Sequence, residues 1–281
     1  MTPASTLLRL EGRDALDLIH RITTQHLREL AVGECRATLF CDFRGRVQHR
    51  AIVAHSGPGI VWLVRADTQG AELFAQVDKQ IFRDKVVMED WSDRVPVTAT
   101  RAAEGAVAGT VESHDGVPVR LHLPDAIDLV VGDAAPITPL DETTRIRLGA
   151  PRHGHEIRED FNALEVGLAR DIHLSKGCFT GQEALMRMMT YSGVRRQLAR
   201  LEGEGAPPAA GEALKRGDAD AGVVTSVASE AESWSALAVV RRDALDSGDA
   251  LASASGARVT RTIAFPDHRP QGLPEAPVRS T

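Results

Sequence analysis

The feature that most constrains the fold is the order of helical and β-type patterns in the first ninety residues. Apolar residues recur at helical spacing in "GRDALDLIHRITTQHLREL", and three β-rich segments follow, "CRATLFC", "RVQHRAIVAH" and "GIVWLVRA", separated by turn sequences rich in Gly, Asp and Pro. A second helical pattern covers "AELFAQVDKQIF", and "KVVMED" has the pattern of a strand. Helix, meander, helix and strand in this order predict an α+β layer structure.

The remainder of the chain predicts two further parts. Short strands dominate residues 95–131, and "DETTRIRLGAP" predicts a short helix with acidic residues at its start and a glycine at its exit. Beyond Arg195, strands alternate with turns of Gly, Pro, Asp and Ser, which is typical of a small β-barrel. We therefore expect an α+β region over 1–192, in two modules of roughly 1–92 and 93–192, a barrel over 196–265, and a disordered or draped tail over 266–281.

Composition excludes several classes of partner. A net charge of −6 gives no overall positive field, so we expect no nucleic-acid partner. No apolar run approaches the roughly 20 residues of a membrane span and no secretory leader is present, so we expect a cytoplasmic protein without a membrane partner. The cysteines Cys35, Cys41 and Cys178 form no CxxC pair, so we expect neither a disulfide framework nor a metal site.

The stretch "KGCFTGQEAL" carries the most specific local pattern. Thr180 and Glu183 match a capping box, which predicts a helix start and a loss of about 1 kcal/mol on Thr180→Ala. Cys178 would then lie just ahead of a helix N-terminus and beside Lys176, and both neighbours favour the thiolate over the thiol. A small buried packing residue is the alternative for Cys178, and the residues alone leave both interpretations open.

The same stretch resembles the K-G-C-[Y/F]-x-G-Q-E signature of the YgfZ-type folate-binding proteins, which are relatives of the glycine-cleavage T-protein, an aminomethyltransferase. The segments "LLRLEGRDALDLIHRITTQHLREL", "FCDFRGRV" and "AGVVTSVA" resemble other parts of that family, so the likeness covers the chain to about Phe265. The resemblance implies two α+β modules and a C-terminal barrel around a central cavity that binds tetrahydrofolate or a related reduced folate. It assigns Cys178 as the functional thiol, and it assigns to cofactor binding the rest of the signature, Lys176, Gly177, Phe179, Gly181, Gln182 and Glu183.

Three positions depart from the T-protein pattern. T-proteins carry paired aspartates after the hairpin glycines, where this chain has His49 and Arg50, so the catalytic carboxylate is missing. Gly149 stands in place of a glutamate implicated in pterin contact, and Cys178 stands in place of an aspartate. All three differences favour the branch of the family that does not act as a transferase.

Two further side chains are candidates for folate contact. Glu165 in "LEVGL" is a candidate cavity carboxylate, and the alternative is a residue on a helix surface. Arg187, together with Arg195, is expected to lie near the glutamate tail of the folate.

Members of the family that the chain resembles assist the assembly or repair of iron–sulfur enzymes with the help of tetrahydrofolate. The leading hypothesis is therefore a monomeric, folate-binding accessory protein for such enzymes, whose partners are those client enzymes or their assembly factors. The alternative is a tetrahydrofolate-dependent aminomethyl or one-carbon transferase with a different acid–base set. A third hypothesis is an interaction module without a ligand. Transfer of a one-carbon group would support the second hypothesis, and failure to bind any folate would support the third.

Overall fold

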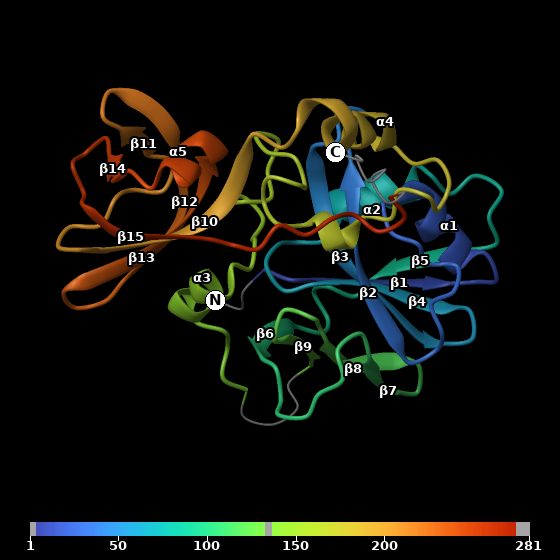
Figure 1. Ribbon diagram of the computed structural model, residues 1–281. Coiled ribbons are helices and arrows are strands. Elements are labelled where there is room, and N and C mark those ends of the chain that lie inside the picture. The colour runs from blue at the N-terminus through green and yellow to red at the C-terminus, as the bar shows by residue number, and fades with distance from the viewer. Residues whose placement is uncertain (1–3, 133–136, 274–281) are drawn as a thin grey trace.

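The computed structural model describes residues 4–132 and 137–273 of the chain. Three antiparallel sheets face a common centre, with short helices at their margins (Figure 1). The first sheet and the C-terminal sheet lie on opposite sides in this view, and the second sheet lies below them. Within these described ranges, no helix combines the length and the apolar character needed to cross a membrane.

The first module is a five-stranded sheet with the strand order β2-β3-β4-β1-β5. The expected meander is present, because β2 pairs with β3 and β3 pairs with β4. Both predicted helices are present on the expected segments. The elements are β1 (Thr6–Glu11), α1 (Ala15–Ile22), β2 (Glu34–Cys41), β3 (Val47–Gly57), β4 (Ile60–Arg65), α2 (Ala71–Asp78) and β5 (Val87–Asp90).

Both faces of the first sheet are buried. On β3, Ala51 and Val53 pack in the cluster formed with α1 and α2, whereas Ile52 and Ala54 pack in the cluster formed with the second sheet. Successive side chains of a strand point to opposite faces, so a strand covered on both sides needs a nearly continuous apolar run. This explains why "AIVA" and "IVWLV" show little polar alternation.

The second module is a four-stranded sheet with the order β6-β9-β8-β7, followed by α3. Asp141 caps α3 by accepting a 2.8 Å hydrogen bond from the backbone N–H of Thr144, and Gly149 ends the helix in the left-handed conformation. This start and exit confirm the helix predicted for "DETTRIRLGAP". The elements are β6 (Val97–Arg101), β7 (Val111–His114), β8 (Val117–His122), β9 (Ile127–Val131) and α3 (Glu142–Leu148).

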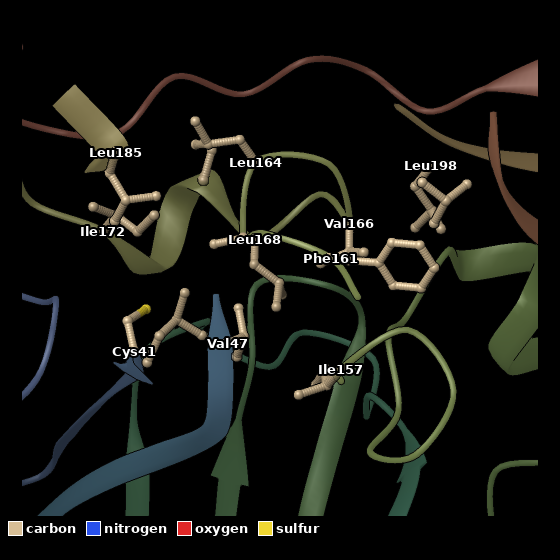
Figure 2. Packing of buried hydrophobic residues seen from close by; sticks show 14 of the residues in the cluster. Cys41, Val47, Ile157, Phe161, Leu164, Val166, Leu168, Ile172, Leu185 and Leu198 are labelled. Atoms are coloured by element: carbon tan, nitrogen blue, oxygen red, sulfur yellow. The ribbon is translucent and has the colours of Figure 1, made fainter. Parts of the chain in front are cut away.

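A largely irregular segment, residues 150–181, joins the three parts. It contains the 3-10 helix η1 (Ala169–Asp171) and leads to α4 (Gln182–Arg187) and the π-helical turn η2 (Met188–Ser192). Figure 2 shows its apolar side chains between Cys41 and Val47 of the first module and Leu198 of the C-terminal sheet. The side chains that build this shared core include Ile157, Phe161, Leu164, Val166, Leu168, Ile172 and Leu185.

The C-terminal sheet has six strands in the order β14-β11-β12-β13-β10-β15. It curls on itself, and an isolated bridge between Ala252 and Arg258 joins the two ends of the strand order. The sequence patterns missed β11 and α5. The elements are β10 (Arg196–Glu204), β11 (Ala213–Arg216), β12 (Ala219–Ser229), β13 (Ser233–Arg241), α5 (Arg242–Ser247), β14 (Ala252–Ser253) and β15 (Val259–Ala264).

Residues 265–273, which we call the strap, run from β15 back to the first module. The backbone of Gln271 donates to the carbonyl of Ile172 at 2.9 Å and accepts from the N–H of Leu174 at 2.8 Å. Asp267 accepts hydrogen bonds of 2.6 and 2.7 Å from Arg242. This part of the expected tail is therefore draped over the protein and held in place, whereas residues 274–281 lie outside the described part of the chain.

Candidate functional site

Two adjoining pockets lie where the three sheets meet. The first, which we call the α3 pocket, has a volume of about 340 Å³ and lies between β3, β4, the second sheet and α3. The second, the strap pocket, has a volume of about 730 Å³ and is bordered by the strap. Both pockets are lined by Arg50, Ile52, Leu123 and Pro151, so these residues form the partition between them.

Arg50 is the charged group of this partition. Its Nε donates to Asp171 Oδ2 at 2.7 Å, and its guanidinium lies 3.6 Å from Asp125 Oδ2. Burial opposes the charge, but Asp171 and Asp125 outweigh it and raise the pKa of Arg50 above its usual value. The cavity therefore holds a fixed, paired cation at one of the two positions where the sequence resemblance predicts the paired aspartates of T-proteins.

Arg65 and His49 lie on the neighbouring part of the first sheet. Arg65 is only 4% exposed, and its guanidinium donates to Thr6 Oγ1, to the Gln69 carbonyl and to His49 Nδ1, all neutral acceptors. Burial lowers the pKa of Arg65 to about 10. Burial, followed by the charge of Arg65, lowers the pKa of His49 to about 4, so this histidine is neutral at pH 7.

Asp67 and His153 form a bonded pair in the wall of the α3 pocket. Asp67 Oδ2 lies 2.9 Å from His153 Nδ1 and also accepts a 2.9 Å hydrogen bond from the backbone N–H of His153. The backbone N–H of Arg50 donates to His153 Nε2 at 3.3 Å. A sequence pattern could not have paired them, because His153 follows α3 and Asp67 follows β4.

The strap pocket is more polar than the α3 pocket. Arg36 and Arg170 supply cations to its lining, and His268 of the strap closes one side. A Cβ placed on Gly149 would lie 2.5 Å from the ring of Phe265, so this aromatic ring occupies the space where a longer side chain would begin. An aromatic side chain therefore forms the pocket wall at the position where the sequence resemblance predicts a glutamate.

The signature loop lies away from both pockets. Cys178 is exposed and borders a third pocket of about 450 Å³, which we call the thiol pocket. The other thiol in its lining is Cys41, which is buried. The remaining lining residues come from α1, β2, α2 and the loop itself: Arg21, Ile22, Phe40, Gln76, Gln80, Phe179 and Thr180.

Lys176 points inward rather than toward solvent. Its Nζ donates to the carbonyl of His20 and lies 5.3 Å from the ring centre of Phe179, a cation–π contact. Burial lowers the pKa of Lys176 to about 8. Lys176 and Phe179 therefore support the loop from beneath and do not line the central pockets.

The capping-box prediction was wrong. The residue that precedes α4 is Gly181, with φ of 86°, and no side chain caps the helix. Glu183 is 89% exposed and lies 3.3 Å from Arg187, while Gln182 donates to the Leu174 carbonyl at 2.7 Å. A Cβ on Gly181 would lie 2.5 Å from the Asp42 carbonyl, because the loop packs against the β2–β3 hairpin here. Close backbone contact, rather than a cap, determines where α4 begins.

The remaining candidates also lie outside the central pockets. Glu165 is buried and forms a bidentate ion pair with Arg196 at 2.8 and 2.9 Å, which ties the irregular segment to β10. Arg187 is 69% exposed on α4. Neither side chain lines the α3 pocket or the strap pocket. The charged and histidine side chains that do line them are Glu34, Arg36, Arg50, Arg65, Asp67, Asp125, Glu142, Arg145, Arg152, His153, Arg170, Asp171 and His268, most of which the sequence patterns did not single out.

No group of three or more His, Cys, Asp or Glu side chains in residues 4–132 and 137–273 is arranged to hold a metal ion. Cys35 and Cys41 are each buried in a different apolar cluster. Burial raises the pKa of both thiols to about 12.

Two parts of the chain match known protein families. Residues 5–101 match the GCVT N-terminal domain, and residues 195–266 match the CAF17 C-terminal beta-barrel domain. The chain therefore combines a region similar to the GCVT N-terminal domain with a C-terminal part similar to that of CAF17. The narrower YgfZ-type assignment stays a prediction.

Individual relatives support the same relationship. The chain is 26% identical over 234 residues to a chloroplastic protein of Arabidopsis thaliana that is named a transferase, and it is 26% identical over 240 residues to an aminomethyltransferase of Symbiobacterium thermophilum. Each alignment covers 69% of this chain, but only 53% of the plant protein and 64% of the bacterial one. The chain thus spans little more than half of the plant relative.

A solved structure shows the same fold at low sequence identity. The crystal structure of glycine cleavage system aminomethyltransferase T from Bartonella henselae superposes with a TM-score of 0.72 at 15% identity, covering 94% of this chain and 86% of that one. The predicted α+β fold with a small C-terminal β-barrel is confirmed, and the barrel has the form of a curled sheet.

Proposed function

We propose that this chain is a folate-binding accessory protein for the assembly or repair of iron–sulfur enzymes, with Cys178 as its functional thiol. The observation that carries the proposal is the ion pair of Arg50 with Asp171 in the partition of the cavity. T-proteins have an aspartate in this region, so a chain that has a paired arginine there keeps a ligand-sized cavity without the acid of the transferase.

The two pockets suit the two ends of a reduced folate. The α3 pocket has mainly apolar walls suited to a flat ring, and the strap pocket offers Arg36 and Arg170 to the carboxylates of the glutamate tail. This arrangement replaces our expectation that Arg187 and Arg195 bind the tail. The aromatic ring of Phe265 would flank the linking benzoyl group.

Cys178 borders the thiol pocket at the surface, whereas the central pockets have different linings. A thiol placed in this way is accessible to a partner protein. We therefore propose that the thiol acts on an iron–sulfur client enzyme or assembly factor, while folate binds in the central cavity.

Calorimetry with tetrahydrofolate and 5-formyltetrahydrofolate tests the first half of this proposal, and saturable binding is expected. Complementation of a strain that lacks the protein tests the second half: Cys178→Ser should abolish the recovery of iron–sulfur enzyme activity, while Cys35→Ser should retain it. Absence of folate binding would overturn the cofactor assignment, and full complementation by Cys178→Ser would overturn the role of the thiol.

A one-carbon transferase is the second candidate, and the Asp67–His153 pair favours it because that pair could supply an acid–base set different from that of T-proteins. Incubation with tetrahydrofolate and an aminomethyl donor tests it. Formation of methylenetetrahydrofolate, with loss on Asp67→Asn, would replace the accessory role by a transferase activity.

A further inference from the structure

Asp67 presents one occupied and one open carboxylate oxygen in the wall of the α3 pocket. Its Oδ2 accepts both hydrogen bonds from His153. In the part of the chain that the structure describes, Oδ1 accepts no hydrogen bond, and the side chain is 24% exposed. An open acceptor in a mainly apolar pocket is a site for a ligand group that donates.

The other carboxylates around the pocket are already engaged. Glu142 pairs with Arg145 at 2.7 and 2.9 Å, and Arg152 lies 3.2 Å from its second oxygen. Asp171 is bonded to Arg50. Asp67 is therefore the acid in this lining that is free to meet a ligand.

The surroundings keep Asp67 ionised. Burial raises the pKa of Asp67, but the hydrogen bonds from His153, together with the charge of Arg65, outweigh burial and leave that pKa below its usual value. Arg50 is the other charged group nearby. A backbone N–H can only donate, so His153 Nε2 accepts from Arg50 and the ring directs its Nδ1–H at Asp67.

We propose that Asp67, positioned by His153, anchors the pterin head of a reduced folate through the N–H donors of its 2-amino-4-oxopyrimidine edge. The apolar walls cover the faces of the ring, and the open oxygen of Asp67 selects a ring that carries such donors. The anchor lies on the segment after β4, not at the position of Gly149. The proposal rests on the proposed function insofar as the ligand is a folate.

Fragment binding tests the anchor. The probes are 6-methyltetrahydropterin, which has the head alone, p-aminobenzoyl-glutamate, which has the tail alone, and tetrahydrofolate, each titrated into the full chain by calorimetry. In Asp67→Asn, the amide oxygen must stay with the donors of His153, so the amide NH₂ would face the donors of the ligand. We expect about tenfold or greater weakening for the head and for tetrahydrofolate, with the tail fragment unchanged.

Asp160→Asn is the matched control, because this carboxylate is 67% exposed and lines neither central pocket. It should leave binding of the head fragment unchanged. If Asp67→Asn does not fold, as judged by thermal unfolding, His153→Gln tests the same anchor. Losing His153 should raise the pKa of Asp67, so on acidification head binding should disappear at a higher pH than in the unchanged protein.

The outcomes separate the anchor from the proposed function. Equal head affinity in the unchanged protein, Asp67→Asn and His153→Gln at every pH would overturn the anchor and leave folate binding intact. Binding of the head that depends on Asp67, without binding of tetrahydrofolate, would support the anchor and overturn the folate assignment. Failure of the unchanged protein to bind the head fragment or tetrahydrofolate would overturn both.

Discussion

The central cavity and the signature loop hold their polar groups in different ways. Arg50 and Asp67 in the cavity are fixed by hydrogen bonds to their neighbours. In the loop, Cys178 and Glu183 are exposed, whereas Lys176, Gly181 and Gln182 contact the body of the protein. A short sequence signature can thus mark a reactive surface, while a ligand-sized cavity is assembled from residues far apart in the chain.

The largest effect on stability should come from removing the charged group of the partition between the two pockets. Arg50→Met would leave Asp171 buried without its cation, and we expect the free energy of unfolding to fall by about 3–5 kcal/mol. Urea unfolding measures this. Arg170→Met is the control, because Arg170 is half exposed and lies 3.9 Å from Asp125, so it should cost less than about 1 kcal/mol. If the two variants lose similar amounts of free energy of unfolding, the buried ion pair in the partition stabilises the protein no more than a surface ion pair does.

A second measurement asks whether the two regions are independent. Iodoacetamide should label Cys178 roughly 100-fold faster than Cys35 or Cys41 at pH 7.5, because the latter two are buried and burial raises their pKa values to about 12. Mass spectrometry of each site gives the rates. Saturating tetrahydrofolate should change the rate at Cys178 by less than about twofold, since different residues line the two sites. A larger change in the labelling rate would show that the cavity and the loop are not independent and would indicate coupling through the strap.

The smallest effects concern the loop itself. Gly181→Ala should destabilise the protein by about 2–3 kcal/mol, because a left-handed φ and the Asp42 carbonyl both oppose a Cβ. Gly177→Ala also has a positive φ but meets no atom within 4 Å, so we expect about 1 kcal/mol. Thermal and urea unfolding compare them.

Thr180→Ala completes this series. Thr180 is exposed and makes no capping hydrogen bond, so its effect should stay within about 0.5 kcal/mol. If the free energy of unfolding instead falls by about 1 kcal/mol, the capping box that the sequence predicts is present after all. Equal losses at the two glycines would show that the hairpin contact of Gly181 does not stabilise the loop.

Local sequence patterns predicted the elements whose signals are local. The periodicity of α1, the meander and the Asp141 to Gly149 boundaries of α3 depend on residues close together in sequence, and the structure has all three. The small helix α5 and the four-residue strand β11 are too short for a periodic signal. The capping box failed because tertiary packing of Gly181 on the hairpin prevailed over a local pattern.

The candidate site was harder to predict for the same reason. Cys178 belongs to a contiguous signature, so it could be selected from the sequence. Asp67 and His153 acquire their relation only when the segment after α3 returns to the end of β4. Glu165 was a reasonable candidate by residue type, but its ion pair with Arg196 of β10 depends on how the C-terminal sheet docks.

The strap has a consequence for the order in which this protein becomes competent to bind. During synthesis, the sheets of the first two modules can form before the ribosome reaches Phe265, because all their strand pairs lie within residues 6–131. The strap pocket gains its last wall only when His268 and Gln271 have been made and Gln271 has paired with the backbone around His173. A nascent chain paused before the strap would therefore have its first two sheets folded but would lack this wall of the strap pocket, so any ligand of that pocket would bind fully only after the strap has been made and docked.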